Sequence, residues 1–184
     1  SLIGTGDFTH PVWREELKER LVTEGNGLYH LRDEYVKEES RKFPGEGTHF
    51  VVSGEISSIY KKNGKTRKVH NVILLPSLEA ADAMAQRLEK IGNIHSDGRP
   101  ILGLDSHDLL EMMLDVCPEG ILIPAHIWTP HFSVLGAKSG FDSVEECFEE
   151  LTPYVHALET GLSSDPAMNW RISKLDRYQL VSNS

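Results

Sequence analysis

The most constraining feature of this sequence is a pair of β-rich runs on either side of an Asn-Gly dipeptide. The runs cover residues 49–60 and 68–75, and Asn63-Gly64 lies between them in the basic stretch Lys61–Lys68. Asn-Gly between two apolar runs is the strongest short-range signal for a β-hairpin, because both residues tolerate the positive φ angles of a tight two-residue turn. The two runs are therefore predicted to pair as antiparallel neighbours.

Around this hairpin, short apolar runs alternate with segments of helical periodicity. Strands are predicted at 2–7, Ile121–Ala125, Tyr154–Glu159 and Tyr178–Ser182, and helices at Pro11–Thr23, after Ser77, after Ser106, after Asp142 or Ser143, and over Ser164–Leu175. Strands that alternate with helices form βα units, which favour a mainly parallel sheet or barrel. The predicted fold class is α/β with one hairpin inserted. The apolar run Ile121–Ala125 is typical of a strand buried on both faces.

Composition narrows the class of protein. The 184 residues are enough for one domain with a core. No apolar run is long enough to cross a bilayer, and no signal segment opens the sequence, so the expected compartment is the cytoplasm. Cys117 and Cys147 have no short spacing and are expected to pack as small apolar residues. The net charge of −9 argues against a broad nonspecific contact with nucleic acid, but it does not exclude a nucleic-acid substrate.

Histidines and carboxylates fall at the ends of the apolar runs. Asp7 and His10 follow the first predicted strand, Glu55 and His70 lie in the two arms of the hairpin, and His126 closes the run Ile121–Ala125. Strand ends are where parallel α/β folds build their sites. Imidazole and carboxylate together suit zinc, manganese or iron, so the pattern indicates a metal site.

Each candidate also has a structural alternative. Glu55 is the natural residue to bridge two ions, with Gly54 allowing close backbone approach, but a Glu that ends a strand is often only a surface residue. His70 in an apolar run is often a hydrogen-bonded core residue. His126 and His131, five residues apart in a loop that contains proline, can converge on one site or be a coincidental pair.

Two further features each have a functional and a structural interpretation. The turn that holds Asp7 and His10 can supply metal ligands, or it can be ordinary turn chemistry. The basic stretch Lys61–Lys68 can contact the phosphates of a nucleic acid, or it can be a solvated turn whose lysines protect a sheet edge.

Five segments, taken in their order and spacing, carry a resemblance to a known family. They are Gly4–Pro11, Ser53–Ser57, Lys68–Asn71, Ile123–His131 and Glu159–Asp165. With these segments the chain resembles the PHP (polymerase and histidinol phosphatase) superfamily of metal-dependent phosphoesterases. Within that superfamily it is most similar to the subgroup that contains endonuclease Q, and the resemblance covers nearly the whole chain.

The resemblance implies a distorted (β/α)7 TIM-like barrel with a trinuclear metal site, in which Glu55 bridges two ions and His70 and His126 are ligands. Asp7 takes the position of an acidic residue in the second family motif. Many members have a ligand histidine directly after it, where this chain has Phe8, so Asp7 or His10 would fill that role. The opening His-x-His and closing Asp-x-His motifs of the family are absent. Residues 1–184 are therefore expected to be a single PHP-like catalytic domain fragment, an incomplete barrel that lacks its first strand and the end of its last βα unit, with weak metal occupancy and little activity by itself.

The expected function is that of a metal-dependent phosphoesterase, a hydrolase acting as a DNA endonuclease or phosphodiesterase at deaminated bases. Its cofactors would be two to three divalent ions of zinc, manganese or iron, with Glu55 and His126 as the central catalytic residues. The full expected ligand set is Asp7, His10, Glu55, His70, His126 and His131. One alternative is a small-molecule phosphatase of the histidinol-phosphatase type, and another is a degenerate, non-catalytic barrel.

Overall fold

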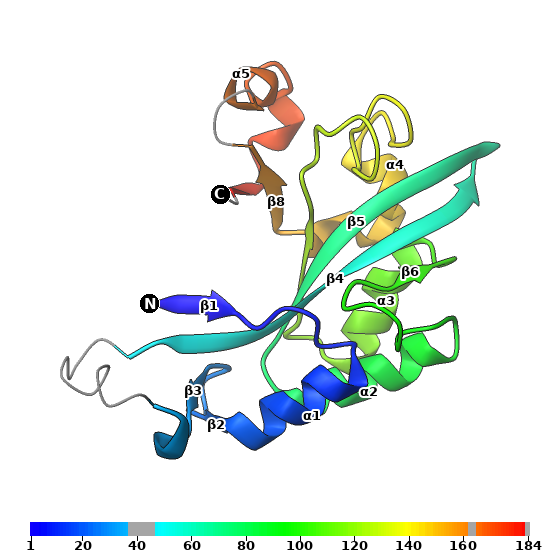
Figure 1. Ribbon diagram of the computed structural model, residues 1–184. Helices are drawn as coiled ribbons and strands as arrows, with labels where there is room; N and C mark the ends of the chain where they lie inside the picture. The colour runs from blue at the N-terminus through cyan, green and yellow to red at the C-terminus, as the bar shows by residue number, and fades with distance from the viewer. Residues whose placement is uncertain (37–46, 162–164, 183–184) are drawn as a thin grey trace.

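The computed structural model describes residues 1–36, 47–161 and 165–182, and its centre is a long twisted hairpin (Figure 1). The hairpin consists of β4 (His49–Lys62) and β5 (Lys65–Leu75), paired without a break from Val52–Leu75 to Lys62–Lys65. Asn63 and Gly64 form the turn, with φ angles of 53° and 72°. The predicted hairpin is confirmed, and both arms extend to the turn itself.

The other strands of the main sheet join this hairpin. Strand β4 pairs in parallel with β1 (Leu2–Gly4) and β6 (Ile101–Leu102), and antiparallel with β3 (Tyr29–Leu31). Strand β2 (Leu21–Thr23) pairs antiparallel with β3, and β7 (Ile121–Pro124) pairs antiparallel with β5. A separate parallel pair consists of β8 (Ala157–Thr160) and β9 (Gln179–Ser182).

The α/β class is confirmed, but the predicted mainly parallel sheet is wrong. Most strand pairs of the main sheet are antiparallel, and the described residues form no closed barrel. The reason lies in the connections: β2 and β3, like β4 and β5, are joined by short loops, and a parallel neighbour needs a crossover of about a dozen residues or more.

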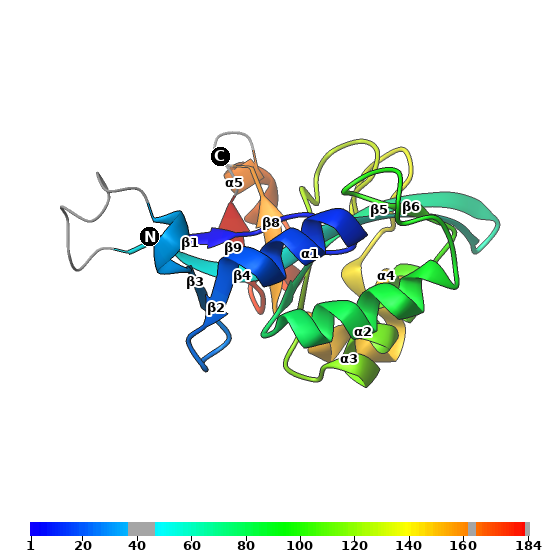
Figure 2. The ribbon, with the colours of Figure 1, turned by 60° about the horizontal axis from the view of Figure 1, so that its bottom comes forward.

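The helices lie on two sides of the hairpin. Helices α1 (Pro11–Arg20), α2 (Leu78–Glu89) and α3 (Ser106–Val116) gather on one side, whereas β8, β9 and α5 (Asp165–Asn169) lie on the other (Figures 1 and 2). The remaining helical segments within residues 1–36, 47–161 and 165–182 are α4 (Val144–Phe148) and the 3-10 turns η1 (Asp33–Tyr35), η3 (Glu149–Tyr154) and η4 (Ser173–Leu175). No helix among the described residues is long and apolar enough to cross a bilayer.

The helix boundaries follow from local chemistry. Ser77 caps α2 as predicted, since its hydroxyl accepts the N–H of Ala80 at 3.1 Å. The cap of α3 is Asp105 rather than Ser106, which is already the first helical residue. Helix α1 ends before the predicted Thr23, because Leu21–Thr23 pairs with β3 instead. The predicted helix up to Leu175 is divided into α5 and η4.

The core lies between the hairpin and helices α2 and α3. Its hairpin side is formed by Ile56, Val69 and Ile73, which are fully buried. Strand β7 contributes Leu122, also fully buried, but Ile121 is 43% exposed, so the prediction of burial on both faces is wrong for this strand. Both free cysteines are buried. The opposite face of the hairpin carries Glu55, Ser57 and His70.

Candidate metal centre

Three predicted ligands meet on that opposite face. Nδ1 of His70 lies 2.9 Å from Oε1 of Glu55 and 3.1 Å from Nε2 of His126. One possible ligand atom from each of the three residues lies within 4.8 Å of those of the other two. The predicted convergence of Glu55, His70 and His126 is thus observed, while their role as ligands remains a prediction.

Strand register explains why these side chains meet. His70 on β5 pairs directly with Ser57 on β4. Because side chains alternate along a strand, Glu55 projects from the same face as Ser57. Strand β7 pairs with β5 up to Pro124 opposite Asn71, and the chain then turns sharply at His126, whose φ is 33°. The site therefore combines one hairpin with the end of a neighbouring strand.

A fourth residue, Glu159 on β8, holds the turn at His126. Oε2 of Glu159 accepts the backbone N–H of His126 at 3.0 Å and lies 3.8 Å from the ring atom Nδ1 of His126. The carbonyl of Glu159 accepts the N–H of Ile127 at 3.0 Å. Carboxylates commonly orient the imidazoles that bind metals through the ring nitrogen facing away from the ion. Glu159 near the end of an apolar run was the sequence signal for this role, and the sequence reasoning did not single it out.

The local electrostatics favour the ligand forms of two of these side chains. Burial alone would raise the pKa of Glu55, but the hydrogen bond and charge of His70, together with Arg99, lower that pKa overall. Burial lowers the pKa of His126, and His70 lowers it further, against the opposing charges of Glu55 and Glu159. At neutral pH the site therefore offers a carboxylate and a neutral imidazole, the forms that metals bind.

The geometry fits a divalent ion. One carboxylate with two imidazoles is a donor set that catalytic zinc uses, and ligand atoms about 2.0–2.1 Å from a tetrahedral ion lie about 3.3 Å apart. The separations of 2.9 and 3.1 Å are close to that value. The hydroxyl of Ser57, on the same face, is buried and has no hydrogen-bond partner among the described residues. Such an orphaned polar atom suits a place where water or an ion belongs.

The other predicted ligands lie outside this group of three. Asp7 is exposed with a φ of 50°, and its carboxylate is so close to Gly98 that a Cβ there would lie 2.2 Å from Cγ of Asp7. His10 occupies the N-cap position of α1 without a side-chain capping bond. His131 is exposed in the loop after His126. Ligand roles for Asp7, His10 and His131 stay predictions.

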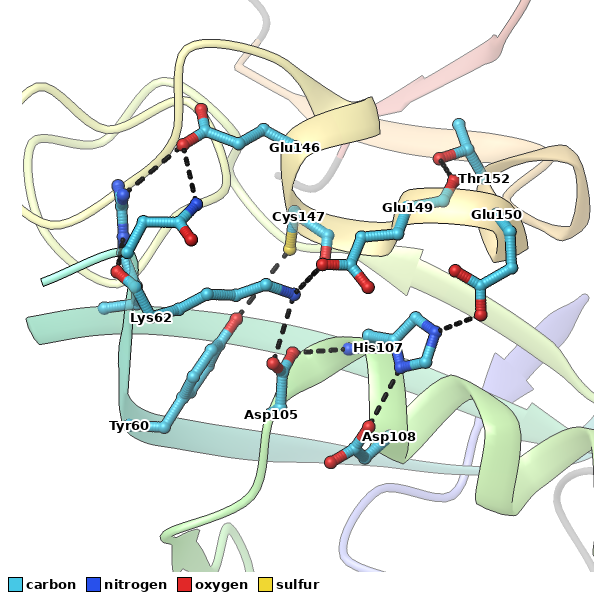
Figure 3. Close-up of polar contacts among 12 residues, drawn as sticks. Tyr60, Lys62, Asp105, His107, Asp108, Glu146, Cys147, Glu149, Glu150 and Thr152 are labelled. Carbon is cyan, nitrogen blue, oxygen red and sulfur yellow. Dashed lines mark hydrogen bonds and ion pairs between the residues drawn. The ribbon is translucent and has the colours of Figure 1, made fainter. Parts of the chain in front are cut away.

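A second set of possible ligands, His107, Glu149 and Glu150, lies at the contact of η3 with α3 (Figure 3). Nε2 of His107 bonds to Glu150 at 2.7 Å, and its Nδ1 bonds to Asp108 at 2.9 Å. Glu149 pairs with Lys62 at 3.3 Å. Because these charges already have opposite partners, we interpret the set as an ion-pair network that joins η3 and α3.

Two residues of the basic stretch are also structural. Lys62 contacts Asp105 at 3.1 Å as well as Glu149. Arg67 is only 4% exposed and its guanidinium lies 4.2 Å from the ring centroid of Phe141. Of the positive charges that the sequence offered for phosphate contacts, these two are already engaged within the fold.

Comparisons with known proteins relate this chain to parts of longer proteins. No protein-family model matches the sequence. Two curated relatives are an uncharacterized protein of Methanocaldococcus jannaschii, 30% identical over 145 residues, and the uncharacterized protein YqxK of Bacillus subtilis, 32% identical over 119 residues. These matches take in 78% and 63% of this chain but only 14% and 29% of the relatives.

The solved structures are more informative. The lesion-specific endonuclease PfuEndoQ from Pyrococcus furiosus is 25% identical with a TM-score of 0.74. Endonuclease Q in complex with a 27-mer duplex substrate, with an abasic lesion at the active site, is 26% identical with a TM-score of 0.77. Both cover 100% of this chain, which spans 39% and 40% of those proteins. The chain therefore shares the fold of endonuclease Q over its whole length, and the resemblance to the endonuclease Q subgroup that its sequence predicted is confirmed.

Proposed function

We propose that this chain is part of a metal-dependent phosphoesterase that cleaves duplex DNA at damaged sites. The observation that carries the proposal is the meeting of Glu55, His70 and His126 on one face of the hairpin, at separations suited to a shared ion. The two structural relatives support DNA as the substrate, because one is described as a lesion-specific endonuclease and the other is bound to a duplex with an abasic lesion. Deaminated bases are the lesions that the sequence resemblance favours.

The residues divide the work by their chemistry. Two to three divalent ions of zinc, manganese or iron, when bound, would polarise phosphoryl oxygens and lower the pKa of water. Glu55 supplies the carboxylate that can bridge two ions, and His70 and His126 supply neutral imidazole nitrogens. Glu159 keeps His126 in its turn through the backbone hydrogen bond. Asp7, His10 and His131 are proposed to complete the ligand set within a single PHP-like catalytic domain fragment, residues 1–184, which would be an incomplete, distorted barrel.

The test uses the full-length natural protein that contains this chain. Purified protein is titrated with Mn²⁺ and assayed on duplexes that carry deoxyuridine, hypoxanthine or an abasic site, with undamaged duplex for comparison. We expect metal-dependent cleavage of the damaged duplexes. Glu55→Gln should weaken Mn²⁺ binding at least 10-fold and abolish cleavage, because it removes the only charge among the three ligands.

The matched control is Glu111→Gln, which alters an exposed glutamate on α3 and should leave binding and cleavage unchanged. Full cleavage in excess chelator, or by Glu55→Gln, contradicts the proposal. Hydrolysis of small phosphate monoesters without DNA cleavage favours the histidinol-phosphatase alternative, and neither activity together with no metal binding favours the non-catalytic one.

A further inference from the structure

Arg99 is a cation at the metal centre that the proposed ligand set does not use. It lies in the loop between α2 and β6, and its Nη1 is 3.1 Å from Oε1 of Glu55. Nδ1 of His70 approaches the same oxygen at 2.9 Å. The side chain of Arg99 is 50% exposed. Its guanidinium therefore contacts the central carboxylate while half of the side chain is open to solvent.

Three hydrogen bonds hold the backbone of Arg99 and its two neighbours. The N–H of Arg99 donates to Oδ1 of Asp97 at 2.9 Å, and the carbonyl of Pro100 accepts the N–H of Ser57 at 3.0 Å. The carbonyl of Gly98 accepts the hydroxyl of Thr9 at 3.3 Å. Gly98 also lies directly against the carboxylate of Asp7, so that any side chain at this position would collide with it. These contacts place Arg99 between the turn that carries Asp7 and the strand that carries Glu55.

The guanidinium of Arg99 has donors left for a phosphate, because its contact with Glu55 goes through Nη1. Arginine has five N–H donors in a planar fork that matches phosphate oxygens in pairs. Divalent ions on Glu55 would take up the negative charge that holds Arg99 there, and they would repel the guanidinium. The fork of Arg99, released from Glu55, would then be free to pair with the oxygens of an anionic substrate held at the ions.

We propose that Arg99 contacts the scissile phosphate, pairing with Glu55 in the free protein and with phosphate oxygens once ions and substrate are bound. This inference rests on the proposed function, since it names a substrate-binding residue of the same site. In this role Arg99 binds the substrate, so removing its charge should leave the affinity for metal ions unchanged or higher. If Arg99 instead held Glu55 in position for the ions, removing it would lower that affinity.

The experiment compares Arg99→Gln and Arg99→Lys with the unmodified full-length protein. Three quantities are measured: the Kd for Mn²⁺ alone, inhibition by inorganic phosphate, and kcat and KM on a duplex with an abasic site. We expect Arg99→Gln to bind Mn²⁺ at least as tightly as the unmodified protein. Its kcat/KM should fall about 10²–10³-fold, the loss typical of one donor to a developing charge. Its inhibition by inorganic phosphate should weaken about 10-fold, and Arg99→Lys should fall between the two, since lysine is a point charge without the fork.

Arg87→Gln is the matched control. Arg87 on α2 is 45% exposed and pairs with one carboxylate, Asp115, at 3.6 Å, so it shares the exposure and pairing of Arg99 away from the site. It should match the unmodified protein in all three measurements. If Arg99→Gln loses Mn²⁺ affinity in step with activity, Arg99 only positions Glu55 and the inference is wrong. The inference is also overturned if the unmodified protein is active and Arg99→Gln has the same kcat/KM and the same inhibition by phosphate. If the unmodified protein neither binds Mn²⁺ nor cuts DNA, the proposed function itself is overturned.

Discussion

Replacing Gly54 by alanine tests how the turn that carries Asp7 is held against β4. A Cβ at position 54 would lie 2.7 Å from Cδ1 and 3.0 Å from Cε1 of Phe8, and 3.3 Å from the backbone nitrogen of Phe8. Carbon atoms in good contact are about 3.5–4.0 Å apart. Phe8 is fully buried and its N–H donates to Ser53 at 3.2 Å, so the ring cannot swing into solvent and the backbone cannot retreat without losing a hydrogen bond.

We expect Gly54→Ala to lower the free energy of unfolding by about 1–3 kcal/mol, the usual cost of overpacking a core. For a chain of this length each kcal/mol shifts Tm by about 2–4 °C, so Tm should fall by roughly 2–12 °C. The measurement is urea unfolding together with a thermal melt. Gly103→Ala is the control, because the nearest atom to its Cβ would be the carbonyl oxygen of Ile59 at 4.0 Å.

A double variant sharpens this test. Phe8→Leu removes Cε1 and the planar ring, and leucine can turn its two Cδ carbons away from the new methyl group. Gly54→Ala should therefore cost at least about 1 kcal/mol less in that background, a coupling typical of residues in contact. If Gly54→Ala unfolds at the same midpoint as the unmodified protein, the close packing of Phe8 on β4 is refuted.

Three other predictions follow from the contacts described above. Burial lowers the pKa of His107, but hydrogen bonds to its two carboxylate partners outweigh burial and raise that pKa overall. The stabilising contribution of His107 should therefore be complete below about pH 6.5 and be lost as pH rises through the raised pKa. In urea unfolding, the stability difference between the unmodified protein and His107→Ala should shrink from about pH 6 to about pH 9. Glu159→Ala should destabilise by about 1–3 kcal/mol because it leaves the N–H of His126 without its acceptor, whereas Glu159→Gln keeps an acceptor oxygen and should cost less in the same assay. Gly64→Ala should cost about 1–2 kcal/mol in a thermal melt, since its φ of 72° strains any residue with a Cβ, and an unchanged Tm would contradict the turn geometry.

The features that the sequence predicted well are local. The hairpin turn depends on two adjacent residues, Asn63 and Gly64, and the cap of α2 depends on Ser77 and a backbone N–H three positions away. The relative direction of the strands was predicted wrongly, because helical periodicity does not reveal which strands a helix connects. Leu21–Thr23 continues the helical pattern of α1, yet it forms a strand since β3 provides a partner.

In the candidate site, too, the sequence predicted the contacts within one or two elements but not the long-range ones. Glu55 and His70 could be placed together because both lie in one predicted hairpin, and His126 could be added because it closes the next apolar run. Arg99 is 44 positions from Glu55 in a loop with no periodicity, so only the folded chain brings the two together. Glu159 closes a predicted apolar run, but it contacts His126 through a backbone N–H, so the residue types alone do not show which partner it has.

The unbroken ladder between β4 and β5 restricts how this segment can vary in length. Inserting or deleting a single residue on one arm between Glu55 and the turn would exchange the two faces of everything beyond it, so that a neighbour of His70, either Val69 or Asn71, would stand where His70 now stands. Adding matched residues to both arms near Lys62 and Lys65 would only lengthen the ribbon. We therefore expect natural variants to lengthen or shorten both arms of the hairpin by the same number of residues. Insertions or deletions of an odd number of residues in one arm alone should be removed by selection.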